Sequence, residues 1–318
     1  MSDYKIRILL ALDGSDQSFE AARYVSQFFL PERLDLVIFH VSSKIPESFW
    51  DIEKSPTYQQ QLAPVAAWAT QEEKRIQEFT ETAREMFIRG GVPKDSIEIN
   101  IQQKKAGIAR DILHEAQGNY DLVVVGRWGI SKLKDLVWGG VANKLIGHMV
   151  HCPLCVVGGK PQTGKILVAL DTSEGAMKAV DFVGAMIKDK DWQVTLFHVI
   201  RNDDFTSPRY RTSFVLHKEW EGKVREKFLT AEKAIVTVYE EALKRLQKAG
   251  VDPDSIATKT VTGVASRAKA IVDQASKGDF GTIVVGRRGL SRVEEFFMGR
   301  VSKKVLQLAK EMAVWVVN

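Results

Sequence analysis

Cysteine is nearly absent from this sequence: Cys152 and Cys155 are the only two among 318 residues. So few thiols argue against a disulfide-stabilised secreted scaffold and favour a reducing compartment, so we expect a cytoplasmic protein. Long apolar runs are missing as well, because no stretch approaches the roughly 18 uninterrupted apolar residues that span a bilayer. The first apolar run, residues 8–12, is cut off by Asp13 and lacks a small-residue cleavage site, which argues against a signal peptide. The sequence therefore predicts no membrane association.

Charge of one sign is not in large excess either, since the formal net charge is +5 and the hydrophobic content of 45% is that of a globular protein. The excess is uneven: residues 1–160 carry 19 Lys+Arg and 20 Asp+Glu, whereas residues 161–318 carry 26 and 20. A basic second half is one sign of a polyanionic partner. Its cations, however, alternate with acidic residues, and no interleaved aromatic pattern accompanies them. We therefore expect no nucleic-acid partner.

What the sequence does have is a regular alternation of short apolar runs with helical apolar patterns. In the first half we predict strands at residues 6–12, 34–41, 97–101, 121–125 and 154–157, with helices between them at about 16–29, 62–89, 107–117 and 140–150. Such alternation predicts a mostly parallel sheet with helices on both faces. Residues 42–61 and 201–216 are expected to be long loops that cover a ligand as lids.

The second half repeats the first. Residues 171–173 (Asp-Thr-Ser) match residues 13–15 (Asp-Gly-Ser) at an offset of 158, and residues 197–199 repeat the Phe-His-Val of residues 39–41. This is the signature of a tandem duplication. We expect an α/β fold of two tandem doubly wound domains, each a five-stranded mostly parallel sheet with helices on both faces. The predicted domains are residues 1–160 and 161–318, joined by a linker at 158–164.

A glycine-rich loop follows the fourth predicted strand of each half with identical spacing. Its glycines are Gly126, Gly129 and Gly139 in the first half and Gly286, Gly289 and Gly299 in the second. Glycines let the backbone approach a ligand closely, and unpaired N–H groups at a helix start attract anions. Ligands of such sheets bind beyond the carboxyl ends of the strands, where strand order reverses. The loops therefore predict an anion site, and an Asp after the first strand with a Val ending the second suits a nucleotide.

These features resemble the universal stress protein family, whose nucleotide-binding members carry Gly-x2-Gly-x9-Gly followed by Ser or Thr and an Asp after the first strand. The resemblance covers essentially the whole chain, twice. It implies that the Asp and the Val contact the adenine and ribose of ATP, bound with or without Mg²⁺, and that the glycine loop binds the phosphates. The implied site residues are Asp13, Val41, Gly126, Gly129, Gly139, Gly140 and Val141, and then Asp171, Val199, Gly286, Gly289, Gly299, Arg300 and Val301.

Both halves depart from the family pattern at one position. The hydroxyl residue after the third glycine is replaced by Gly140 in the first half and by Arg300 in the second. Gly140 loses a side-chain hydrogen bond worth about 1.5–3 kcal/mol to a charged phosphate. Arg300 either supplies a charge-assisted contact or fills the phosphate site with its bulk. Because glycine cannot clash, the sequence slightly favours the first site, and an alternative is that both sites are empty.

The two cysteines, two of the histidines and the cations of the glycine loops each have a functional and a structural interpretation. Cys152 and Cys155, beside two histidines, suggest zinc or redox chemistry, but burial at a helix-to-strand turn explains them equally. His40 and His198 lack a partnered nucleophile, so hydrogen-bonded structural histidines are favoured over a triad. The loop cations are able either to contact phosphates or to remain solvated; they are Arg127, Lys132, Lys134, Arg287, Arg288 and Arg292.

Three classes of function follow. The first is a stress-response sensor or regulatory module that binds an adenine nucleotide in one or both domains, with slow hydrolysis at most because no catalytic base or magnesium carboxylate set accompanies the loops. The second is a scaffold for an unidentified protein partner, with vestigial sites. Here the resemblance implies that the halves pair as an intramolecular pseudo-dimer through residues 154–157 and 314–317. The third is an electron-transfer flavoprotein-like module, whose flavin would need a different loop.

Overall fold

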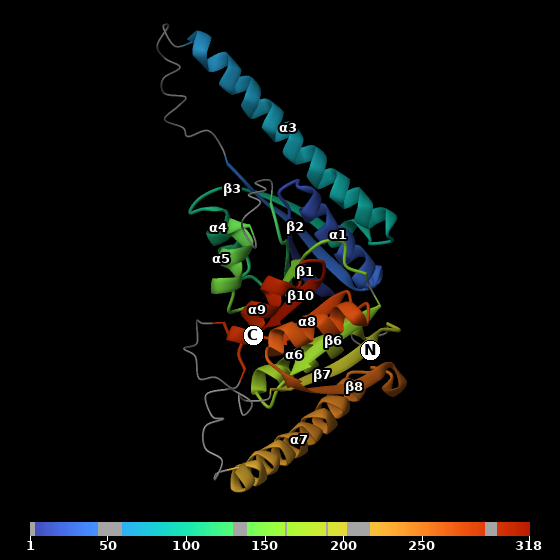
Figure 1. Cartoon of the computed structure of the whole chain (residues 1–318). Helices are drawn as coiled ribbons and strands as arrows, with labels where there is room; N and C mark the ends of the chain where they lie inside the picture. Colours follow the sequence, from blue (N-terminus) through green and yellow to red (C-terminus); the bar gives the residue numbers. More distant parts are fainter. Residues whose placement is uncertain are drawn as a thin grey trace. The chain divides into compact units, whose positions relative to one another are not determined.

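The computed structural model describes residues 4–43, 59–129, 139–162, 164–188, 190–201, 217–289 and 298–318 (Figure 1). The chain divides into two compact units, Met1–Gly158 and Gly159–Asn318. The predicted lids lie largely outside the described residues, at 44–58 and 202–216. Among the described residues, no helix is both long and apolar enough to cross a bilayer.

The first unit is a parallel sheet with the strand order β3-β2-β1-β4-β5. Its strands are β1 (Ile6–Ala11), β2 (Leu34–Ser42), β3 (Ile97–Gln103), β4 (Leu122–Gly126) and β5 (Leu154–Val157). Its helices are α1 (Asp16–Phe28), α3 (Gln59–Arg89), α4 (Ile108–Glu115) and α5 (Gly140–His148). α1 packs beside α3, and α4 packs beside α5, so the two pairs cover the two faces of the sheet (Figure 1).

The second unit repeats this arrangement with the order β10-β9-β6-β7-β8, and its strands again pair in parallel. The strands are β6 (Lys165–Leu170), β7 (Gln193–Arg201), β8 (Ile256–Val264), β9 (Thr282–Gly286) and β10 (Ala313–Val317). The helices are α6 (Glu174–Ile187), α7 (His217–Lys248), α8 (Arg267–Lys277) and α9 (Arg300–Leu308). Single 3₁₀ turns at Pro31–Arg33, Lys94–Ser96 and Pro253–Ser255 lead into β2, β3 and β8.

The central strands explain why the chain folds this way. In β4, Leu122, Val123 and Val124 are fully buried, and Ile283 and Val284 of β9 are as well. A strand covered by helices on both faces reads as a continuous run of β-branched residues rather than an alternating one. The predicted fold class is confirmed: each unit is a five-stranded parallel sheet between two helical layers.

Candidate functional site

Strand order reverses at the same place in both units. In the first unit β1 lies between β2 and β4, and in the second β6 lies between β7 and β9. The chain leaves these neighbouring strands toward opposite faces, which opens a crevice at their carboxyl ends. The residues that follow β1, β4, β6 and β9 therefore lie at the two candidate sites.

Asp13 and Asp171 are held in place at these strand ends. Oδ1 of each carboxylate accepts a hydrogen bond from the backbone N–H two residues later, at 3.0 Å in both units. These partners are Ser15 and Ser173, whose side chains cap α1 and α6 by accepting from the N–H groups of Ser18 and Ala176, at 3.2 and 3.3 Å. The aspartates are thus fixed by the same turn that starts each helix.

The glycine loop lies directly against each aspartate. A Cβ added to Gly129 would lie 2.5 Å from Oδ2 of Asp13, and a Cβ added to Gly289 would lie 2.5 Å from Oδ2 of Asp171. A side chain at either position would have to push the carboxylate aside, which gives a physical reason for glycine in the second place of the motif.

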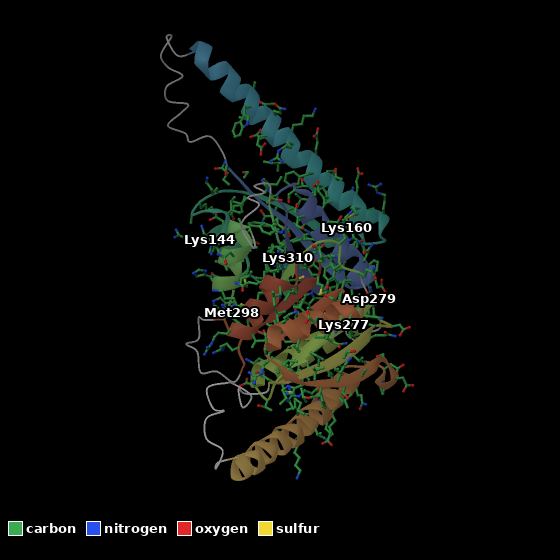
Figure 2. The ribbon with its side chains drawn as sticks, viewed as in Figure 1. Lys144, Lys160, Lys277, Asp279, Met298 and Lys310 are labelled. Atoms are coloured by element: carbon green, nitrogen blue, oxygen red, sulfur yellow. The ribbon has the colours of Figure 1, made fainter. Side chains whose placement is uncertain are left out.

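The third glycine of each motif closes the loop. The N–H of Gly139 donates to the carbonyl of Arg127 at 3.0 Å, and the N–H of Gly299 donates to that of Arg287 at 2.8 Å. Both glycines are helix N-caps without a side-chain hydrogen bond to the first turn of α5 or α9. The first N–H groups of both helices are therefore not capped by a side chain of the cap residue, as an anion site requires. Met298, labelled in Figure 2, directly precedes Gly299 and marks where the described chain resumes.

The second unit contains a cavity of about 400 Å³ at this crevice. All seven site residues that the sequence implied for this half line it: Asp171, Val199, Gly286, Gly289, Gly299, Arg300 and Val301. Arg300 is exposed and leaves the cavity open, so its bulk does not fill the site. Val199 is almost fully buried, at 4% exposure, and supplies an apolar wall.

The first unit has the same backbone elements but a more crowded entrance. Val41, the last residue but one of β2, is 6% exposed, and Gly140 and Val141 begin α5 as their counterparts begin α9. Next to Asp13, a Cβ at Gly14 would lie 2.7 Å from the ring of Phe79 and 3.2 Å from Nη1 of Arg75, both on α3. Side chains of the protein itself thus pack against the turn that holds Asp13.

Arg75 is fixed at this entrance by its neighbours. Its guanidinium donates to Glu72 at 2.8 and 2.5 Å and lies over the ring of Phe79, 5.7 Å from the centroid. The hydrogen bonds that Arg75 donates to Glu72 are the main cause that raises its pKa; burial opposes them, and the charges of Glu72 and Asp13 add to the rise. A permanent positive charge therefore stands near Asp13.

The second unit has neither an arginine nor a phenylalanine at the matching positions of α7. Ile235 and Ala242 are buried on α7 as Ile76 and Ala83 are on α3, which aligns the two helices at an offset of 159. Ala234 and Val238 then stand where Arg75 and Phe79 stand in the first unit. These two side chains are smaller than Arg75 and Phe79 and carry no charge.

His40 and His198 are structural histidines, as expected. Nδ1 of each ring lies 2.7 Å from a backbone carbonyl, that of Leu12 or of Leu170, and must donate to it because a carbonyl only accepts. Burial is the main cause that lowers the pKa of both imidazoles. The two rings therefore fix the ends of β1 and β6 beneath the crevices as neutral side chains.

Two of the loop cations do not behave as expected. Arg127 and Arg287 were interpreted as exposed residues that contact phosphates or water, but they are 0% and 3% exposed and do not line the cavity. Their N–H groups bond to the carbonyls of Val157 and Val317, so each residue extends its strand and turns its side chain into the protein. Arg288, the next residue, is exposed and does line the cavity. Lys132, Lys134 and Arg292 lie outside the described residues.

Sequence reasoning missed Arg267, the first residue of α8, which also lines the cavity. Its position follows a helix cap, Ser266, whose side chain accepts from the N–H of Lys269 at 3.4 Å. An arginine directly after a cap, at the carboxyl edge of the sheet, was the only signal available. Because Arg267 lies far from the glycine loop in the sequence, no local pattern connects the two.

The cysteine pair is buried as the structural interpretation expected. Cys152 and Cys155 are 2% and 0% exposed, and the thiol of Cys152 donates to the carbonyl of Tyr120 at 3.3 Å. Burial raises the pKa of the Cys152 thiol to about 12, so it stays protonated near neutral pH and is a poor metal ligand or nucleophile.

Comparison with known proteins assigns the fold to a family. The model of the universal stress protein family matches residues 6–158 and again residues 163–318. The universal stress protein YxiE of Bacillus subtilis is 27% identical over 145 residues, which cover 46% of this chain and 93% of YxiE.

Solved structures share the fold. A universal stress protein from Archaeoglobus fulgidus is 17% identical, covers 98% of both chains and has a TM-score of 0.59. A universal stress protein in complex with cAMP is 20% identical over 49% of this chain and 97% of its own, with a TM-score of 0.34. That second likeness is too distant to say anything about the ligand of this chain. Because the family model matches nearly every residue in two successive copies, the chain belongs to the universal stress protein family.

Proposed function

We propose that this chain is a stress-response protein whose second domain binds ATP or a related adenine nucleotide in the cavity at the glycine loop, and that it acts as a sensor or regulatory module. Family membership supports the stress-response role. The observation that carries the nucleotide proposal is that all seven residues implied by the motif line one cavity of about 400 Å³. That volume lies within the range of roughly 300–1,000 Å³ typical of small-molecule sites. In this proposal the domains are residues 1–160 and 161–318.

The geometry suggests a role for each group. The carboxylate of Asp171 is placed to accept hydrogen bonds from the sugar or base, because its Oδ2 faces the loop at Gly289. Val199 offers an apolar surface to the flat face of the base. The N–H groups that begin α9 suit the phosphates, since a helix N-terminus carries partial positive charge. We expect slow hydrolysis at most, because the described lining offers only Asp171 and His198 as possible bases.

The alternative function, a scaffold with vestigial sites, is favoured for the first domain by one observation. Phe79 and Arg75 of α3 pack against Gly14 and bring a cation near Asp13. A ligand there would have to displace these side chains, whereas the second domain carries Ala234 and Val238 instead. We therefore assign the nucleotide to the second domain, although the sequence by itself slightly favoured the first.

The test is to release bound nucleotide from freshly purified protein with acid and quantify it by chromatography. The blocking variant is Val301→Trp, because Val301 lines the cavity at 36% exposure and a larger side chain there leaves the core intact. A substitution of Gly286 is less suitable, since its Cβ would lie 2.8 Å from the backbone of Gly175. The matched control is Val141→Trp, at the same position in the first domain.

The expected result is one nucleotide per chain, retained in Val141→Trp and lost in Val301→Trp. If the wild-type protein releases none and does not bind ATP on titration with or without Mg²⁺, the sensor function is wrong and the scaffold alternative replaces it. Loss in Val141→Trp alone would move the site to the first domain.

A further inference from the structure

The cavity of the second unit is lined by more cations than anions. Three exposed arginines line it, from two different sides: Arg267 begins α8, while Arg288 and Arg300 flank the glycine loop. Asp171 is the only carboxylate in the described lining. The cavity therefore offers three guanidinium groups against one fixed negative charge.

The first unit has no charge at any of the three equivalent positions. Ala109 and Ile112 of α4 are buried as Ala268 and Ile271 of α8 are, which places Ile108 opposite Arg267 in the alignment of the two helices. Trp128 and Gly140 are the counterparts of Arg288 and Arg300 at the offset of 160. Since the backbone is shared, the arginines are a feature of the second site and not of the fold.

The same lining is a poor magnesium site. Mg²⁺ at a nucleotide is usually held by one or two protein carboxylates together with the phosphates and water. Asp171 is a single carboxylate, and its Oδ1 already accepts from the N–H and the hydroxyl of Ser173, which leaves only Oδ2 for a ligand. The described parts of the chain contain no group of three or more His, Cys, Asp or Glu placed to hold a metal ion. Glu294 and Glu295 of the loop lie outside those parts.

Neutralisation of a polyphosphate is one task of a divalent metal, and guanidinium groups also neutralise phosphates, through bidentate hydrogen bonds. We propose that Arg267, Arg288 and Arg300 take the place of a divalent metal in the second cavity, so that the species bound is a metal-free nucleotide polyphosphate. This inference rests on the proposed function of that cavity and specifies the form of its ligand.

The test compares ligand titrations of the full chain in EDTA and in excess Mg²⁺, with ATP and with inorganic tripolyphosphate as probes. The wild-type protein is expected to bind both probes in EDTA, and Mg²⁺ is expected to weaken binding because it neutralises the ligand before the arginines do. Arg267→Gln is expected to weaken binding in EDTA by about tenfold or more, the effect of one charge-assisted hydrogen bond.

The control is Lys277→Gln at the opposite end of α8 (Figure 2). It removes the same charge about 15 Å along the helix, beyond a Debye length at physiological salt. It is expected to leave both titrations unchanged. An equal loss in both variants would mean that general charge, not contact, attracts the ligand, and would overturn the inference.

The outcomes separate the two proposals. Binding of ATP only in the presence of Mg²⁺, or unchanged binding in Arg267→Gln, Arg288→Gln and Arg300→Gln, overturns the metal-free inference and leaves the nucleotide function standing. Arginine-dependent binding of tripolyphosphate in EDTA without any binding of ATP supports the arginines as the polyphosphate site and overturns the nucleotide function. Binding of neither probe under either condition overturns both.

Discussion

His40 and His198, which lie next to the candidate sites, are expected to make the free energy of unfolding depend on pH. Each ring donates through Nδ1 to a backbone carbonyl, that of Leu12 just after β1 or that of Leu170 at the end of β6, and burial lowers its pKa below the usual value of 6.5. The charged groups near His40 are Asp13, Arg75 and Glu72, and those near His198 are Asp171 and Arg267. A histidine kept neutral by folding binds a proton more readily in the unfolded chain, so acid favours unfolding.

We predict that the free energy of unfolding falls as the pH drops through 6.5 toward the lower pKa of the folded state. The contribution is fully present above pH 6.5, and the slope is at most about 1.4 kcal/mol per pH unit for each histidine. Urea unfolding of the wild-type protein, His40→Asn and His198→Asn between pH 5 and 8 measures it. Each variant should have a shallower pH dependence than the wild-type protein, and parallel curves would contradict the prediction.

At this scale the sequence singled out residues that its repeats mark and not those that only the fold brings together. Asp171, Val199 and the three glycines of the second loop recur at fixed offsets and line one cavity, and their role in binding stays a prediction. Arg267 was missed because α8 reaches the cavity from the other side of the crevice. Arg127 was misplaced since side chains alternate between the two faces along an extended strand, and its pairing with Val157 continues β4 by one residue.

The elements were predicted well where two independent signals agreed. The long helix of the first half was expected at about 62–89 and is α3, Gln59–Arg89, because an apolar stripe ends there at two glycines and a proline. β3 was expected to end at Ile101 and continues to Gln103, because it pairs with β2 up to Ser42. Pairing with a neighbouring strand extends a strand past its apolar run, and no local pattern records that.

The end of α7 provides a prediction about an element. Gly250 follows the helix with φ +93°, and the N–H of Val251 donates back to the carbonyl of Leu246 at 3.0 Å. A side chain is strained in this conformation, so Gly250→Ala should lower the free energy of unfolding by about 1 kcal/mol. Gly147→Ala is the matched control, because Gly147 lies within α5 and its Cβ would meet nothing within 4 Å.

For that control the same chemical change should raise the stability, by up to about 1 kcal/mol, since alanine favours the helix more than glycine does. The urea unfolding midpoints of the two variants, compared with that of the wild-type protein, test whether the two changes in stability have opposite signs. Shifts of the same sign would show that the left-handed conformation at Gly250 is not what determines the cost.

At the scale of the whole molecule, the two copies of the duplicated domain share the same backbone fold but differ in the side chains at their candidate sites. The sequence predicted the duplication because the matching segments recur at offsets of 158 to 160. It did not predict that Arg75 and Phe79 pack against the turn next to Asp13, since they lie on α3 some 60 residues later in the chain and reach it only through the packing of that helix. The pairing of the halves as a pseudo-dimer and the cytoplasmic location stay predictions.

If the second domain alone binds nucleotide, the ligand should protect one half of the chain from hydrogen exchange and leave the other unchanged. At a concentration of about 100 times Kd, a ligand stabilises the structure that it binds by roughly 2.7 kcal/mol. Exchange should therefore slow at the backbone amides around Gly286, Gly299 and the start of α9, and stay the same around Gly126 and Gly139. Mass spectrometry of peptides from the full chain, with and without ATP, measures both halves at once.

Two variants give this experiment its internal control. Val301→Trp should abolish the protection, and Val141→Trp should leave it as in the wild-type protein, because the two residues occupy matching positions at the starts of α9 and α5. Protection of both halves would mean that Arg75 and Phe79 move aside for a second ligand, and the assignment to one domain would be wrong. Protection of the first half alone would mean that the nucleotide prefers the site without the three arginines, which would leave their charge without a role in binding.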